Sequence, residues 1–241
     1  MKTILKALAV VLTVGAVPAF AEEAAAPVDP LSFNVSVTTD YRYRGISQTR
    51  TKPALQGGAD YAFDSGFYIG TWASTIKWIK DGGGDANVEI DLYGGYKTEI
   101  AKGLTLDVGL LQYAYPSNKL SPSANTLEVY GALSFGPITA KYSHSTTNLF
   151  GFADSKGSGY LDVSATLDLG DGLTIVPHVG HQSVKHGSQF SYTDYSVTVN
   201  KDYAGFIWSA AAVGADTDAY VGPNSKNLGK AALVLAVKKS F

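Results

Sequence analysis

The chain contains no cysteine, and its only methionine is the initiator. Without cysteine there is no lipid-attachment residue behind an N-terminal leader, so a lipoprotein is excluded. A disulfide framework is excluded as well, although such frameworks are common in small exported domains.

Long hydrophobic runs are also missing, except near the N-terminus. Lys2 and Lys6 precede an apolar run over 7–17, followed by Pro18 and the small-residue pattern Ala19-Phe20-Ala21. The run is shorter than the roughly 20 residues that a spanning helix needs, and a cleavage site follows it. We therefore expect 1–21 to be a cleaved signal peptide, 22–30 a short lead-in and 31–241 a single β-barrel domain.

Strong charge and phosphate-binding or metal-binding motifs are absent too. Removal of Lys2 and Lys6 moves the formal net charge from −2 to −4, which argues against nucleic acid as a partner. The glycine run at 82–84 lacks the Lys-Ser/Thr continuation of a phosphate loop. Four histidines are spread over loops and both strand faces. We expect no metal and no cofactor.

Short glycine-containing turns recur at a nearly constant spacing. From one glycine to the next the intervals are 37, 33, 36 and 33 residues, which fits two strands of about ten residues and one longer loop. This period predicts an all-β, transmembrane antiparallel barrel of twelve strands, with short periplasmic turns and longer extracellular loops; ten or fourteen strands stay open. The turn glycines are Gly66, Gly103, Gly136, Gly172 and Gly205.

Polar and apolar residues alternate along the predicted strands, as expected when one face meets lipid and the other meets water. In the first predicted strand, one face carries Phe33, Val35, Val37, Thr39, Tyr41 and Tyr43, and the other carries Asn34, Ser36, Thr38, Asp40, Arg42 and Arg44. A soluble β-sandwich alternates too, but its strands are shorter.

Aromatic residues near the predicted strand ends favour the membrane barrel over the sandwich, because such barrels carry aromatic girdles at both interfaces. The final strand also ends on an aromatic residue, which predicts recognition by the barrel-assembly machinery, although Lys239 departs from the usual C-terminal pattern. The predicted membrane-interface aromatics are Tyr41, Tyr43, Phe63, Phe67, Tyr96, Phe135, Phe206 and Phe241.

The segment Asp40-Tyr41-Arg42-Tyr43-Arg44-Gly45-Ile46-Ser47-Gln48-Thr49 resembles the opening of the TorF family of porin-like proteins. The resemblance continues through the Pro53-Ala54-Leu55-Gln56-Gly57-Gly58 stretch, the Glu89 to Tyr96 stretch and Tyr192-Thr193-Asp194-Tyr195. It implies a small barrel in the Gram-negative outer membrane with a pore role, and it supplies no catalytic residues.

The inward face predicted from strand parity carries more acids than bases. Uncompensated carboxylates in a narrow tube favour cations or neutral solutes over anions. Arg42 and Arg44, just before the first loop, offer planar donor forks for a carboxylate or phosphate, or else neutralise Asp40 and neighbouring acids. The predicted lumen residues are Asp40, Arg42, Arg44, Asp60, Glu89, Asp91, Asp107, Glu128, Lys141, Asp162 and Asp194.

We therefore expect a non-enzymatic outer-membrane channel for passive diffusion of small hydrophilic solutes. A hydrolase of the esterase or phospholipase kind is one alternative, because a simple register across the Gly172 turn would place Ser164 opposite His178 with Asp162 nearby. A structural or adhesive barrel without a conducting pore is the other. One mouth loop could fold inward as a constriction, and the sequence does not say which.

Overall fold

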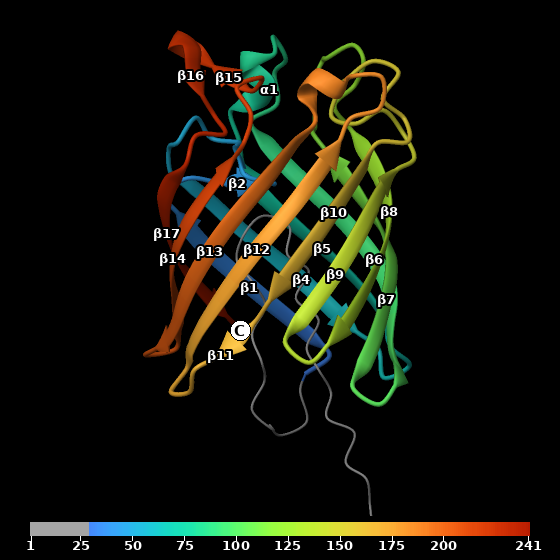
Figure 1. Cartoon of the computed structure of the whole chain (residues 1–241), viewed down its shortest axis with the longest axis vertical. Helices are drawn as coiled ribbons and strands as arrows, with labels where there is room; N and C mark the ends of the chain where they lie inside the picture. The colour runs from blue at the N-terminus through green and yellow to red at the C-terminus, as the bar shows by residue number, and fades with distance from the viewer. Residues whose placement is uncertain (1–28) are drawn as a thin grey trace, which may run out of the picture.

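The computed structural model describes residues 29–241, which form a closed β-barrel (Figure 1). The wall strands are β1 (Leu31–Thr38), β4 (Ala54–Ala62), β5 (Phe67–Thr75), β6 (Val88–Ala101), β7 (Leu104–Ala114), β8 (Thr126–Phe135), β9 (Ile138–Ser145), β10 (Gly159–Ala165) with β11 (Leu167–Asp168), β12 (Leu173–Ser183), β13 (Tyr192–Tyr203), β14 (Phe206–Ala215) and β17 (Ala232–Ser240).

Every wall strand pairs antiparallel with its neighbours, and β1 closes the barrel by pairing with β17 as well as with β4. The sheet holds 13 strand segments, of which β10 and β11 both pair with β12 and share one position in the wall. The barrel therefore has twelve wall positions, and the predicted strand number is confirmed.

All the predicted glycine turns lie at one end of the barrel (Figure 1). Gly66, Gly103, Gly136, Gly172 and Gly205 all have positive φ, between +54° and +93°, which glycine adopts without a steric penalty. The Phe33 amide donates to the carbonyl of Phe241, so the start of β1 and the C-terminus meet near this short-turn end.

The opposite end carries the longer loops and the minor elements. These are the hairpin β2 (Arg42–Tyr43) with β3 (Ile46–Ser47), the helix α1 (Trp78–Asp81), the 3₁₀ turns η1 (Ser188–Phe190) and η2 (Pro223–Ser225), and the pair β15 (Val221–Gly222) with β16 (Lys226–Asn227). Within the described residues, no helix is long and apolar enough to cross a membrane.

The wall residues alternate between an apolar outer surface and a polar interior. Along β1, Phe33, Val35 and Val37 are exposed on the outside, whereas Ser36 and Thr38 are buried inside. The aromatics predicted for the turn side remain on or near the outer surface at that end: Phe63, Phe67, Phe135, Phe206 and Phe241 are exposed, and Tyr96 is half-buried against Phe67.

The prediction was wrong about where the first strand ends. β1 stops at Thr38, and 39–53 turns into the barrel; we call this segment the inward loop. Tyr41, only 1% exposed, and Tyr43 therefore lie inside and are not membrane-interface aromatics. The alternation of the wall continues into the loop, but its apolar members pack on interior side chains instead of facing outward. The predicted signal peptide lies outside the described residues.

Candidate functional site

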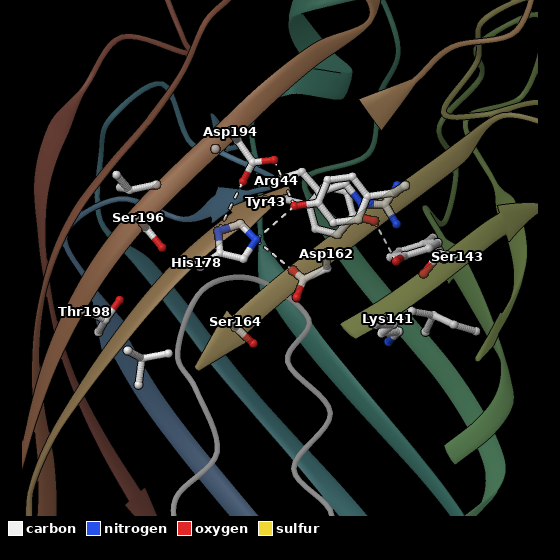
Figure 2. Close-up of a pocket in the computed structure, with 16 residues that line it drawn as sticks. Tyr43, Arg44, Lys141, Ser143, Asp162, Ser164, His178, Asp194, Ser196 and Thr198 are labelled. Atoms are coloured by element: carbon white, nitrogen blue, oxygen red, sulfur yellow. Dashed lines mark hydrogen bonds and ion pairs between the residues drawn. The ribbon is translucent and has the colours of Figure 1, made fainter. Parts of the chain in front are cut away.

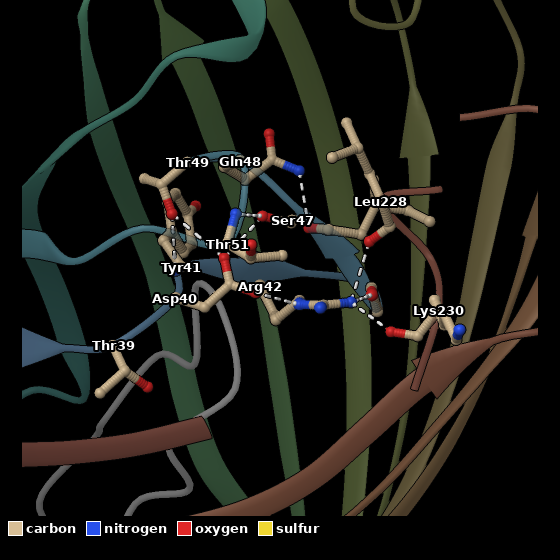
Figure 3. Close-up of polar contacts among 12 residues, drawn as sticks. Thr39, Asp40, Tyr41, Arg42, Ser47, Gln48, Thr49, Thr51, Leu228 and Lys230 are labelled. Atoms are coloured by element: carbon tan, nitrogen blue, oxygen red, sulfur yellow. Dashed lines mark hydrogen bonds and ion pairs between the residues drawn. The ribbon is translucent and has the colours of Figure 1, made fainter. Parts of the chain in front are cut away.

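A polar network around Asp40 holds the inward loop in its fold (Figure 3). The Asp40 carboxylate forms an ion pair with Arg42 at 2.6 Å and accepts hydrogen bonds from the hydroxyls of Ser47 at 2.6 Å and Thr49 at 3.1 Å. The Ser47 hydroxyl in turn accepts from the Thr51 amide. Because Asp40 and its three side-chain partners are all buried, the loop has a defined shape inside the barrel.

Arg42 ties the inward loop to the segment before β17. Its guanidinium donates to the backbone carbonyls of Gly45 at 3.0 Å, Leu228 at 2.8 Å and Lys230 at 3.2 Å (Figure 3). The Ser47 amide donates to the same Leu228 carbonyl. One arginine thus satisfies carbonyls from two loops at once.

Arg44 reaches the opposite wall. Its guanidinium forms a two-pronged pair with Glu128 on β8, at 2.7 and 3.1 Å, and donates to Gln182 on β12 at 2.7 Å. It also lies over the Tyr160 ring at 4.2 Å. Since β8 lies five positions from β1 in a wall of twelve, this contact carries the inward loop across the interior.

The tip of the loop requires a glycine. Gly45 has φ +78°, and a Cβ there would lie 2.6 Å from the Cβ of Asp194 on β13. Any larger residue would therefore push the loop away from the wall.

Two tyrosines attach the inward loop to the side of β6 and β7. The Tyr41 hydroxyl donates to Glu89 at 2.9 Å while its ring packs edge-on against Trp72 at 5.4 Å. The Tyr43 hydroxyl lies 2.7 Å from the Tyr113 hydroxyl. The loop is therefore held from several sides of the interior.

The inward loop lies between two cavities of the interior. The inner cavity, of about 120 Å³, lies on the short-turn side and is lined by polar and charged groups, including Arg44, Lys141, Asp162, His178 and Asp194 (Figure 2). The outer cavity, of about 340 Å³, lies on the long-loop side. Tyr43 lines both, as a partition would.

The charges of the inner cavity are largely paired. His178 Nε2 lies 2.7 Å from Asp162, and its Nδ1 lies 3.6 Å from Asp194 (Figure 2). The Tyr160 hydroxyl donates to Asp194 at 2.9 Å. Lys141, opposite Asp162 in the register, lies over the Tyr130 ring at 4.0 Å.

Closer to the short turns, tyrosine hydroxyls donate hydrogen bonds to two further acids. Asp60 accepts from Tyr93 at 2.5 Å, and Asp107 accepts from Tyr68 at 2.6 Å. Asp91 differs, because it is fully buried and neither carboxylate oxygen has a hydrogen-bond partner within residues 29–241. The structure thus places every predicted lumen residue inside the barrel, and it brings Arg44, Glu128 and Asp194 together at the partition.

The predicted register of Ser164 opposite His178 is present. No hydrogen bond joins the two side chains in the described part of the chain, and His178 is oriented by Asp162 instead. Among these residues there is also no group of three or more His, Asp or Glu side chains placed to hold a metal ion.

The sequence analysis missed two partners of Arg44. Gln182 and Tyr160 were not singled out, although Tyr160 has the same strand parity as Asp162 and was identifiable as inward-facing on that basis. Gln182 becomes important only through the loop that folds against it.

The chain belongs to the family whose model, described as "Bacterial protein of unknown function (Gcw_chp)", matches residues 21–241. Among curated protein sequences, no match is found.

Solved porins share the fold at very low sequence identity. The KdgM porin aligns with a TM-score of 0.57 and 8% identity, covering 87% of this chain and 99% of that one. The KdgM porin in complex with disordered oligogalacturonate aligns with a TM-score of 0.56 and 7% identity, covering 88% of this chain and 98% of that one. The NanC porin aligns with a TM-score of 0.56 and 11% identity, covering 86% of this chain and 97% of that one. At such identities the likeness establishes the fold alone.

Proposed function

We propose that this member of the Gcw_chp family is an outer-membrane channel through which small hydrophilic solutes diffuse passively. The observation that carries the proposal is a closed barrel with a polar wall, whose inward loop narrows the interior without filling it and leaves a cavity on each side. The barrel architecture shared with the KdgM and NanC porins supports it.

The outer surface supports a membrane location. Large apolar side chains such as Leu92, Leu110 and Leu233 are about half or more exposed there, which water would penalise and lipid would not. Together with the predicted signal peptide at 1–21, this points to export and insertion into the outer membrane of a Gram-negative cell. Phe63, Phe67, Tyr96, Phe135, Phe206 and Phe241 would then form the periplasmic aromatic girdle.

Two further proposals follow from the sequence. The strand β17 and the Phe241 that follows it present the C-terminal signal to the barrel-assembly machinery. The Arg-Gly-Ile-Ser-Gln core that suggested the TorF resemblance forms the tip of the inward loop, so we propose that the motif encodes the constriction.

The inward loop acts as the constriction, and the wall acids set the selectivity. Asp40 and Glu128 are neutralised by Arg42 and Arg44. The partly exposed acids that keep only a tyrosine partner are Asp60 and Asp107, whereas Glu89 and Asp91 are fully buried. Carboxylates without a cationic partner in a narrow tube favour cations and neutral solutes.

Single-channel recording of the refolded mature chain in a planar bilayer, with a salt gradient, tests the proposal. We expect discrete channel openings. We also expect a reversal potential whose sign shows that cations permeate more readily than anions. Anion preference would assign control to Arg42 and Arg44. A folded barrel that shifts its gel mobility on heating yet stays silent would contradict the channel and favour the structural or adhesive barrel.

The hydrolase alternative is weaker in one specific respect. A nucleophilic serine needs a base within hydrogen-bond reach, and His178 directs its Nε2 to Asp162 at 2.7 Å and lies 3.2 Å from the Tyr160 hydroxyl. We propose that this histidine holds the wall charges in place instead.

A further inference from the structure

The outer cavity is walled by two groups of aromatic side chains from different loops. Trp78 of α1 packs edge-on against Tyr115 at 5.2 Å. In the second group, Phe190 of η1 lies 4.7 Å from Phe152 and 6.3 Å from Tyr220. These loops gather at the long-loop end of the barrel (Figure 1). All five rings line the cavity, so a molecule inside it is surrounded mainly by ring surfaces.

The floor of the outer cavity is the inward loop. Tyr43 and Ile46 line it from below, and the Tyr43 ring packs against Phe150 at 5.6 Å. The volume of about 340 Å³ falls in the range of roughly 300–1,000 Å³ typical of small-molecule sites. Solute entering from outside would meet this cavity before the constriction.

Several polar side chains of the lining are occupied by other parts of the protein. Ser47 bonds to Asp40 and Thr51, and Asp81 is paired with Arg50. Gln182 accepts from Arg44 and donates to the carbonyls of Gly159 and Ser183.

Two of the four tyrosine hydroxyls of the lining are engaged as well. Tyr220 donates to the Phe190 carbonyl, and Tyr43 bonds to Tyr113. Burial raises the pKa of Tyr220, so that hydroxyl stays uncharged near neutral pH. A sugar would therefore leave most of its hydroxyls without partners, and an ion would find no free counter-charge.

We propose that the outer cavity is a binding site for a small, uncharged molecule that carries an aromatic ring. Ring faces and edges on both sides supply stacking and edge-to-face contacts, which are the contacts this lining has in surplus.

This inference goes beyond the proposed function, because it assigns an aromatic ligand to the mouth of the barrel and leaves the hydrophilic solutes of the channel unchanged. Binding is measured separately, on the folded barrel in detergent. A silent bilayer with saturable binding would reject the channel and keep the site. Normal conductance without binding would reject the site and keep the channel.

The test uses the fluorescence of Trp78. The chain has three tryptophans, so Trp72→Phe with Trp208→Phe leaves Trp78 as the only reporter. Acetophenone, a neutral aromatic ketone, is titrated against the full mature chain, with maltose and benzyltrimethylammonium as the polyhydroxylated and cationic probes. We expect saturable quenching by acetophenone and a shallow, non-saturating response to the other two.

A variant of the wall then assigns the effect to the cavity. Phe152→Ala with Phe190→Ala should weaken acetophenone binding about tenfold, since two of the rings that face the probe are removed. Phe63→Ala with Phe135→Ala, at the other end of the barrel, is the matched control and should leave binding unchanged. Heat-modifiable gel mobility verifies folding, and Phe190→Ala alone replaces the double variant if that one fails to fold.

Three results would overturn the site: non-saturating quenching by acetophenone, tighter binding of maltose or of the cation, or equal binding in the cavity variant and the parent. Acetophenone binding that is lost in the cavity variant and kept in the control would support it.

Discussion

The wall and the inward loop are built from similar residues but are held together in different ways. The wall is a backbone ladder in which each strand pairs only with its neighbours in the strand order, and each short turn contains a glycine with positive φ. The inward loop is held by side chains that reach distant strands, such as Arg44 to Glu128 on β8. The wall therefore forms the barrel, and the loop occupies part of its interior, where we propose that it forms the constriction.

Deleting the inward loop should have the largest effect on conductance, because it leaves the wall without the loop. Thr38 and Ala54 are register partners, so an Asn-Gly turn replacing 39–53 joins β1 to β4 without disturbing the ladder. We expect a folded barrel whose single-channel conductance rises several-fold. Shortening the mouth segment 119–123 is the control and should change conductance little; an unchanged conductance in the loop variant would show that the loop is no constriction.

A charged residue introduced on the outer surface of the barrel tests whether that surface faces lipid. Leu110 on β7 is exposed on the outer surface, and Leu110→Arg should lower the free energy of unfolding in lipid vesicles by about 2–4 kcal/mol. Thr105→Arg, on the inner face of the same strand near its end, should cost less than about 1 kcal/mol. Equal losses, measured by denaturant titration, would be incompatible with a lipid-facing surface.

Breaking the ion pair at the partition should act on selectivity in two directions. Arg44→Met leaves Glu128 unpaired and should shift the reversal potential toward cations. Glu128→Gln leaves Arg44 unpaired and should shift it toward anions. We expect a change of roughly a few-fold in the permeability ratio in each case. Lys102→Met, at an exposed turn, is the control. If Arg44→Met and Glu128→Gln shift the reversal potential in the same direction, the ion pair does not line the path of the ions.

The same contrast explains how far the sequence could be interpreted. The strand number, the turns and the inward parity of Glu128 and Asp194 follow from local alternation and from glycines with positive φ, which depend on neighbouring residues only. The inward loop cannot be predicted from local alternation. The alternation from Phe33 to Arg44 continues unbroken past Thr38, where the chain leaves the wall. Tyr41 is buried by Trp72 and Glu89, which no local pattern connects to it.

His178 should show the smallest effect, and it discriminates between a wall residue and a catalytic one. In the wall role, His178→Ala removes a partner of Asp162 and changes conductance by less than about twofold, because the inward loop is anchored elsewhere. In the hydrolase role, the same variant abolishes an esterase or phospholipase activity present in the parent. Assays of parent and variant with a short-chain ester and with a phospholipid measure this directly. Ser164→Ala gives the matched comparison, since it leaves the pair of His178 and Asp162 intact and would lower activity only if the serine were the nucleophile.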